Sequence, residues 1–225
     1  MIEEQKDDSG SVPLPFGKQT VVGSTVILGD CVEVMKGFED NQFDLAIVDP
    51  PYGINAGNGT GRAIRVAIER GKIKGGDWDK EIPTEEYFDE LFRISKYQII
   101  WGGNYFPLPT SKSFIIWDKG ETMYKRDFAE CEFAWVTPDK PAKIFKKGPN
   151  QLDRIHPTQK PVALYDWVFQ QYTKQGDLIL DTHLGSGSSR IAAHKHNLEF
   201  VGCEIDAEYF AAQEARFKEF TSQLR

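Results

Sequence analysis

The stretch FDLAIVDPPY, residues 43–52, decides the fold. Residues 43–48 are largely apolar, which is typical of a strand buried on both faces of a sheet. Two consecutive prolines then remove backbone donors and fix φ, so the strand must end there. In open α/β sheets, ligands bind where parallel strands end. The sequence therefore predicts a buried strand that presents Asp49, Pro50, Pro51 and Tyr52 at a binding edge.

Similar apolar runs recur along the chain and alternate with helical patterns, which indicates a doubly wound, mostly parallel α/β sheet of seven strands. The other expected strands are 25–28, 97–101, 113–117, 132–136, 178–180 and 200–203. The expected helices are 84–95, 161–172, 188–196 and 207–220. Residues 1–20 have little periodicity and are interpreted as a flexible tail, whereas 21–225 are expected to form a single domain.

Composition limits the classes of function. The net charge of −7 argues against binding nucleic acid through overall charge, so any DNA-binding residues must be gathered on one face. No apolar run is long enough to span a bilayer and the first residues are acidic, so a soluble cytoplasmic protein is expected. Cys31, Cys131 and Cys203 lack paired spacing, so neither a disulfide framework nor a metal site is expected.

The turn at residues 49–52 suits a planar base that carries an amino group. The Tyr52 ring can stack on the base, and the Asp49 carboxylate and the Pro50 carbonyl can each accept one amine hydrogen. Asp49 also offsets positive charge that develops on the nitrogen during group transfer. A plain surface turn is the competing interpretation, because Asp-Pro-Pro sequences are frequent in loops.

A second candidate site follows the expected strand at 178–180. Asp181 begins a glycine-rich turn with Gly185 and Gly187, and a helical pattern follows, as in sites for nucleotide-like cofactors. Glu204, at the end of the next strand, can bind ribose hydroxyls. Arg190 replaces the third small residue of a dinucleotide fingerprint, which disfavours NAD. Asp206 is expected only to cap the last helix.

These motifs resemble those of amino-methylating DNA methyltransferases over about residues 25–215. Residues 49–52 are similar to the catalytic motif, 181–187 to the S-adenosylmethionine loop, and 156–161 to the segment along the methionine end of the cofactor. Residues 29–31 look like the position that faces the cofactor's adenine, and 101–106 recur in phage-type members. The catalytic motif precedes the cofactor loop, as in the permuted beta group, which implies a Rossmann-like methyltransferase fold with circularly permuted motif order.

The resemblance implies S-adenosyl-L-methionine as cofactor and adenine N6 in DNA as target, because the catalytic motif begins with Asp. Cytosine N4, an RNA amine and a non-catalytic nucleic-acid-binding module remain alternatives. Thr182 and His183 depart from the family, which commonly has Pro and an aromatic residue there. The implied cofactor-binding residues are Asp30, Cys31, Asp49, His156, Thr158, Gln159, Lys160, Asp181, His183, Gly185, Ser186, Gly187, Ser188, Glu204 and Ile205.

Two long loops, at about 53–78 and 118–155, are expected to face DNA. The first carries Arg62, Arg65, Arg70, Lys72 and Lys74. The second carries Lys140, Lys143, Lys146 and Lys147, for which solvated loop lysines are an equal alternative. The expected partner is double-stranded DNA with the target base flipped out of the helix. A homodimer and a cognate restriction endonuclease are further candidate partners.

Overall fold

The computed structural model describes residues 23–58, 62–126, 129–149 and 154–223. Its centre is one eight-stranded sheet in the order β1-β8-β7-β2-β3-β5-β4-β6. β5 is antiparallel to both of its neighbours, and the other pairs are parallel. The strands are β1 (Ser24–Leu28), β2 (Leu45–Val48), β3 (Gln98–Trp101), β4 (Phe114–Asp118), β5 (Cys131–Val136), β6 (Lys143–Lys146), β7 (Leu178–Asp181) and β8 (Glu199–Glu204).

The predicted doubly wound, mostly parallel α/β class is confirmed, but the predicted number of seven strands is wrong. The additional strand is β6, which pairs with β4 at one edge of the sheet. The strand has only four residues, KIFK, and their burial alternates between half-buried and exposed, so only one face of this edge strand packs on the protein. The sequence predicts a basic loop for this stretch instead of a strand. The other seven strands lie within one or two residues of their predicted bounds.

The four predicted helices are present as α3 (Glu85–Ile94), α4 (Val162–Tyr172), α5 (Ser188–Lys195) and α6 (Ala207–Ser222). Two further α-helices were not predicted. α1 (Cys31–Lys36) begins at an Asp30 cap, and α2 (Arg62–Glu69) lies inside the predicted loop 53–78. Two short 3-10 turns, Ala56–Asn58 and Gly103–Tyr105, complete the described elements.

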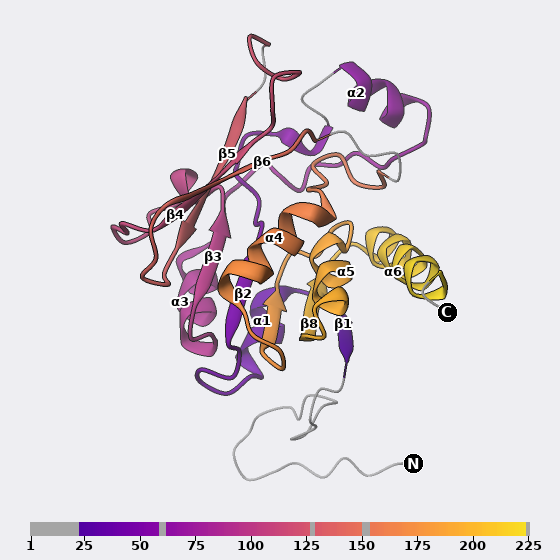
Figure 1. The fold of residues 1–225 in the computed structure, drawn as a ribbon. Helices are drawn as coiled ribbons and strands as arrows, with labels where there is room; N and C mark the ends of the chain where they lie inside the picture. The colour runs from indigo at the N-terminus through magenta and orange to yellow at the C-terminus, as the bar shows by residue number, and fades with distance from the viewer. Residues whose placement is uncertain (1–22, 59–61, 127–128, 150–153, 224–225) are drawn as a thin grey trace, which may run out of the picture.

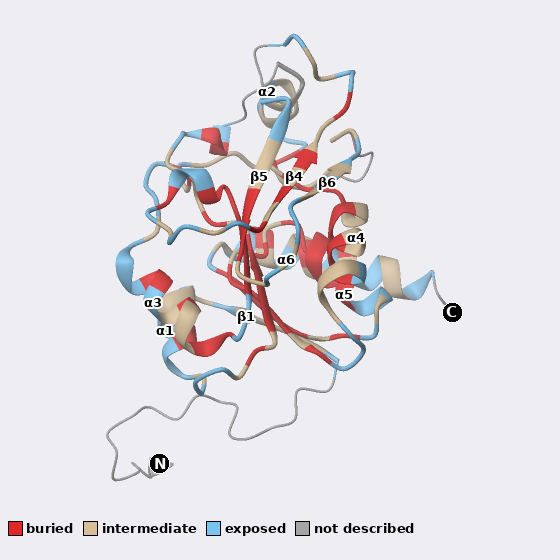
Figure 2. Cartoon of the chain, turned by 60° about the vertical axis from the view of Figure 1, so that its left-hand side comes forward, coloured by how far each residue is buried: buried red, intermediate tan, exposed pale blue. Residues whose placement is uncertain are grey.

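The helices cover both faces of the sheet. Figure 2 shows α1 and α3 on one side of the buried strands and α4 and α5 on the other. Each face has its own apolar cluster, one built around Trp101 and Phe169 and the other around Phe43 and Leu91. Burial on both faces explains why the central strands, such as β2, are apolar at every position.

Parallel strands bring their carboxyl ends to one edge of the sheet. In Figure 1 this is the upper edge, and α2 lies beyond it. Residue 49 follows β2, and residues 182–187 follow the neighbouring strand β7, so both predicted motifs lie at this edge. The predicted tail at 1–20 lies outside the described residues. Within the described ranges, no helix combines the length and apolar character that crossing a membrane requires.

Candidate active site

The turn after β2 holds its carboxylate and its aromatic ring together. The Tyr52 hydroxyl donates a hydrogen bond to Asp49 Oδ1 at 2.5 Å. The ring of Tyr52 stacks on Tyr105, with centroids 5.0 Å apart and an interplanar angle of 12°. Tyr105 is 42% exposed, so the aromatic pair extends from the buried carboxylate to the surface.

Lys160 contacts the other oxygen of the same carboxylate. Its Nζ lies 2.5 Å from Asp49 Oδ2 and 3.0 Å from Glu132 Oε2, and it donates to the Tyr52 hydroxyl at 3.1 Å. Burial raises the pKa of Asp49, and the Lys160 ammonium opposes that rise. Although burial acts against it, Lys160 and Lys119 lower the pKa of Glu132 to about 2.

Asp79 fixes the backbone of the turn at residues 49–52, the predicted catalytic turn, and the residues that follow it. One of its carboxylate oxygens accepts from the backbone N–H groups of Tyr52 at 2.5 Å and Gly53 at 3.0 Å. The other accepts from the N–H of Ala56 at 2.6 Å. Asp79 is 2% exposed, so these three donors are paired away from water. The turn is therefore held by a side chain 27 residues further along the chain.

A cavity of about 480 Å³ opens at the carboxyl edge, within the range of ligand-binding clefts. Asp49 and Pro51 line it from the catalytic turn, whereas Gly185 and Ser186 line it from the glycine-rich turn. The two motifs that the sequence analysis singled out therefore converge on one pocket. Most of the predicted cofactor residues line it, namely Asp30, Cys31, Asp49, His156, Thr158, Gln159, Lys160, His183, Gly185, Ser186, Ser188, Glu204 and Ile205.

The conformation of the glycine-rich turn is fixed by its two glycines and by a hydrogen bond to Glu204. Gly185 and Gly187 have positive φ angles of +51° and +71°, which residues with a side chain rarely adopt. Gly187 is the N-cap of α5. Glu204 accepts a hydrogen bond from the Gly185 N–H at 2.8 Å. Asp181 does not line the cavity but accepts from the Ser189 hydroxyl at 2.5 Å. Burial raises the pKa of Asp181 to about 7.

Asp30 and Asp206 both cap helices. Asp30 Oδ1 accepts from the N–H groups of Val32 and Glu33, so this residue anchors α1 at the rim of the cavity. Asp206 accepts from the N–H groups of Glu208 and Tyr209, as predicted for the last helix.

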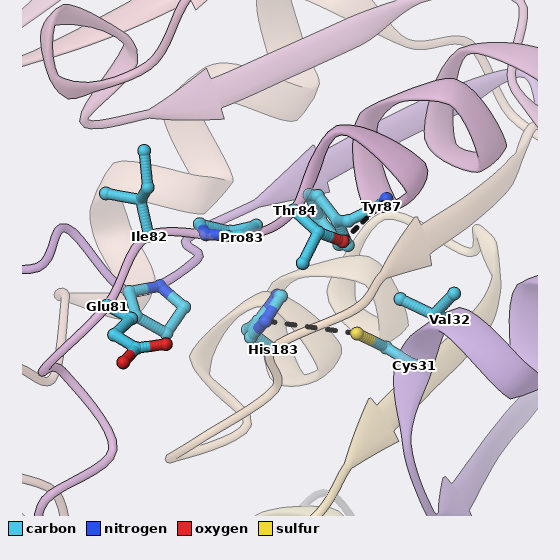
Figure 3. A pocket seen from close by; sticks show the side chains of 9 residues that line it. Cys31, Val32, Glu81, Ile82, Pro83, Thr84, Tyr87 and His183 are labelled. Atoms are coloured by element: carbon cyan, nitrogen blue, oxygen red, sulfur yellow. Dashed lines mark hydrogen bonds between the residues drawn. The ribbon is translucent and has the colours of Figure 1, made fainter.

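His183, one of the two residues that depart from the family motif, also lines a smaller cavity of about 220 Å³. Figure 3 shows the His183 ring pointing toward the Cys31 thiol, with 4.0 Å between Nε2 and Sγ. Thr182 contacts His183 Nδ1 at 2.9 Å and the Tyr87 hydroxyl at 2.7 Å. Burial lowers the pKa of His183 to about 4, so the ring is neutral at pH 7. His183 lines both this cavity and the larger one.

His156 shapes the opposite wall of the larger cavity. Its ring packs against Tyr209 and Trp78, with centroid distances of 4.4 Å and 5.1 Å. Burial lowers its pKa to about 3, and Nδ1 accepts from the Thr158 N–H at 3.3 Å. The neutral ring holds the turn that precedes Lys160.

The predicted DNA-contacting residues differ in their surroundings. Arg65, Arg70 and Lys72 are exposed on and after α2. Lys74 instead forms ion pairs with Asp206 at 2.6 Å and Glu208 at 3.2 Å, so it ties this segment to α6. The Arg62 side chain lies outside the described residues.

The second basic group lies on and beside β6. Lys146 and Lys147 are exposed and Lys143 is half-buried. Lys146 pairs with Glu121, whereas Lys140 contacts the Gln171 carbonyl.

Sequence reasoning missed Asp79, Glu132, Tyr105 and Trp78. Each is a single residue in an irregular segment or near a strand end, and only the fold brings it to the turn at residues 49–52 or, for Trp78, to the wall of the larger cavity. The run WGGNYF, which was noted for its recurrence, was the one signal that included Tyr105.

Comparisons with known proteins agree with this fold and site. Residues 116–215 match the model of a family described as DNA methylase. The Escherichia coli K12 protein YubD is 27% identical over 210 residues, which cover 86% of this chain and 89% of YubD. The type II methyltransferase M2.MboI of Moraxella bovis is 22% identical over 261 residues, covering 94% of this chain and 93% of M2.MboI.

Solved structures share the architecture. The M1.HpyAVI–SAM complex has a TM-score of 0.56 and 20% identity, covering 85% of this chain and 98% of that one. The cytosine-N4-specific PvuII DNA methyltransferase has a TM-score of 0.57 and 13% identity, with coverage of 91% and 94%. The fold is therefore that of the Rossmann-like methyltransferases. The resemblance to the N6/N4 DNA methyltransferase family, indicated by the motifs, is confirmed.

Proposed function

We propose that this chain transfers a methyl group from S-adenosyl-L-methionine to adenine N6 in double-stranded DNA. One observation carries the proposal: Asp49 of the catalytic turn and Gly185 of the glycine-rich turn line the same cavity of about 480 Å³. A donor bound on the glycine side and a base bound on the aromatic side would meet at the Asp49 carboxylate.

The cavity fits the proposed cofactor by the chemistry of its walls. Glu204 and Asp30 offer carboxylates that could accept hydrogen bonds from ribose hydroxyls and an adenine amine, and the exposed Ile205 offers apolar surface that could cover a flat ring. His156 and His183 are neutral, so neither repels a sulfonium. When bound, the cofactor would supply an electrophilic methyl group, and the carbon–sulfur bond would break as the carbon–nitrogen bond to the amine forms.

The residues of the chain prepare the acceptor amine. Each Asp49 oxygen has two lone pairs, so the carboxylate can accept an amine hydrogen while it keeps Tyr52 and Lys160 as donors. The Pro50 carbonyl can take the second hydrogen, which directs the nitrogen lone pair toward the methyl donor. The proton that the methylated amine gives up passes to water. Alignment and the fixed negative charge account for the acceleration.

The catalytic assignment is tested with Asp49→Ala. The variant should still bind S-adenosylmethionine, measured by calorimetry, and lose transfer of labelled methyl groups to duplex DNA. Transfer by the variant at near wild-type rate would refute the role of Asp49. Preferential labelling of RNA would show that RNA, and not DNA, is the substrate.

Cytosine N4 is the second candidate, because the PvuII enzyme, which shares the fold, is cytosine-N4-specific. Both amines fit the acceptor geometry around Asp49. Mass spectrometry of nucleosides from methylated DNA separates them: N6-methyl-2′-deoxyadenosine supports the proposal, whereas N4-methyl-2′-deoxycytidine supports cytosine N4 as the target instead.

A further inference from the structure

Lys160 is enclosed between two carboxylates at the catalytic turn. Its side chain is only 3% exposed, yet it carries an ammonium group 2.5 Å from Asp49 and 3.0 Å from Glu132. Burial opposes a charge on Lys160, but the two carboxylates raise its pKa above the ordinary value. A charge in such a position persists only where partners compensate for its lost hydration. The cluster is therefore a built feature rather than a surface pairing.

Charges alternate along this cluster. Lys119 Nζ lies 2.8 Å from Glu132 Oε1, so Glu132 has one lysine on each carboxylate oxygen. Glu132 would remain paired through Lys119 alone, whereas Asp49 has Lys160 as its cation. The position of Lys160 is consequently best explained by what it does to Asp49.

We propose that Lys160 and Glu132 are positioning residues for methyl transfer, Lys160 holding Asp49 ionised and aimed at the target amine and Glu132 holding Lys160 in place. The inference rests on the proposed function of Asp49 as the amine acceptor. A protonated Asp49 would lose acceptor capacity for the amine hydrogen. Lys160 favours the ionised form of Asp49 and Glu132 disfavours it, so the two residues oppose each other electrostatically.

Because the two residues act on Asp49 in opposite directions, their substitutions should shift the pH profile of methyl transfer in opposite directions. Single-turnover methyl transfer to unmethylated duplex DNA is measured from pH 5.5 to 9 for the wild type, Lys160→Met and Glu132→Gln. In Lys160→Met the acid limb of the profile should move to higher pH, with roughly 100-fold slower transfer at pH 7 and partial recovery above it. In Glu132→Gln the acid limb should move to lower pH. The ionisable groups that face Asp49 are Lys160, Glu132, Tyr52, Tyr165 and Asp181.

The matched control is Lys96→Met. Lys96 forms a lysine–aspartate pair with Asp44 at 2.7 Å, but the pair is exposed and lies where β2 and β3 begin. Its loss should leave the rate and the pH profile within twofold of wild type. Affinity for S-adenosylmethionine, measured by calorimetry, should stay within about threefold in all variants, because the positioning role acts on Asp49 rather than on the cofactor.

The outcomes are separable. Shifts of the same sign in Lys160→Met and Glu132→Gln, or no shift, overturn the inference. A tenfold loss of cofactor affinity with an unchanged profile assigns Lys160 to the cofactor instead and also overturns it. If Lys160→Met does not fold, the double variant Lys160→Met/Glu132→Gln restores charge balance. Its acid limb should lie at higher pH than that of Glu132→Gln, and an equal or lower pH overturns the inference. A wild type without transfer defeats the proposed function itself.

Discussion

The backbone of Gly102 lies directly against the ring of Tyr52. A Cβ atom at position 102 would overlap the ring carbons Cε1, Cδ1 and Cζ of Tyr52. Gly102 follows β3, has a φ angle of +70°, and donates its N–H to the Phe133 carbonyl at 2.8 Å. The end of β3 therefore forms a wall for the aromatic residue of the turn that follows β2.

Gly102→Ala should displace Tyr52 and slow transfer by roughly 10- to 100-fold, since base–aromatic stacking contributes about 1–3 kcal/mol. The backbone strain of a left-handed alanine adds about 1–2 kcal/mol of destabilisation. The control is Gly176→Ala, because Gly176 has a φ angle of +86° with nothing within 4 Å of the added Cβ. Both variants should lose stability in thermal unfolding through the left-handed backbone, and Gly102→Ala should lose more because its Cβ also overlaps the Tyr52 ring. Equal losses of transfer would show that overlap with Tyr52 is not the cause.

Asp79→Ala should loosen the catalytic turn. It leaves the N–H groups of Tyr52, Gly53 and Ala56 without their carboxylate, and a hydrogen bond to a charged group is worth about 1.5–3 kcal/mol. We expect a lower Tm and at least tenfold slower transfer, whereas calorimetry should give an unchanged affinity for S-adenosylmethionine. Asp77→Ala removes an exposed ion pair with Lys80 and should change stability by less than about 1 kcal/mol. Normal transfer by Asp79→Ala would contradict the clamping role.

The sequence was sufficient to predict the sheet, because buried parallel strands are apolar throughout. β2 and β7 each combine a short apolar run with a sharp stop, and the motif after each strand follows from the stop. Since parallel neighbours end at the same edge, the meeting of Asp49 with the glycine-rich turn could be expected before any coordinates. Each of these inferences depends only on local sequence and a general rule of topology.

What the sequence could not provide depends on packing between distant segments. Glu132 is the second residue of an ordinary strand, β5, and nothing near it in the chain indicates that it contacts Lys160. Asp79 is likewise one acid among several in its segment. β6 was missed because its edge position leaves Ile144 69% exposed and lysines at both ends. Contacts of this kind are set by the three-dimensional arrangement.

Asp181 predicts a specific pH dependence of stability. Burial raises its pKa in the folded protein to about 7, so the folded state binds the proton more tightly than the unfolded state. The stability that this proton contributes is fully present below the unfolded pKa, near 4, and is lost as the pH rises toward 7. Asp181→Asn carries no charge at any pH. The Tm of this variant minus that of the wild type should therefore be larger at pH 8 than at pH 5. The same Tm difference at both pH values would contradict the shift.

The segment around α2 should contact DNA phosphates through Arg65, Arg70 and Lys72, which are exposed beyond the carboxyl edge of the sheet. Lys74 is omitted from this set because Asp206 and Glu208 already pair with it. Changing the three residues to alanine should weaken duplex binding. It should also reduce the slope of log K against log salt by roughly 2–3, since each phosphate contact contributes about 0.9.

Fluorescence anisotropy at several salt concentrations measures that slope. The control variant changes Lys96, Lys174 and Lys195 to alanine, which alters the net charge by the same amount but acts at the opposite edge of the sheet. Its slope should equal that of the wild type, because counterion release depends on the phosphates that are contacted and not on total charge. Equal slopes for both triple variants would mean that the net charge of −7 governs binding, and that the α2 segment is not the DNA interface.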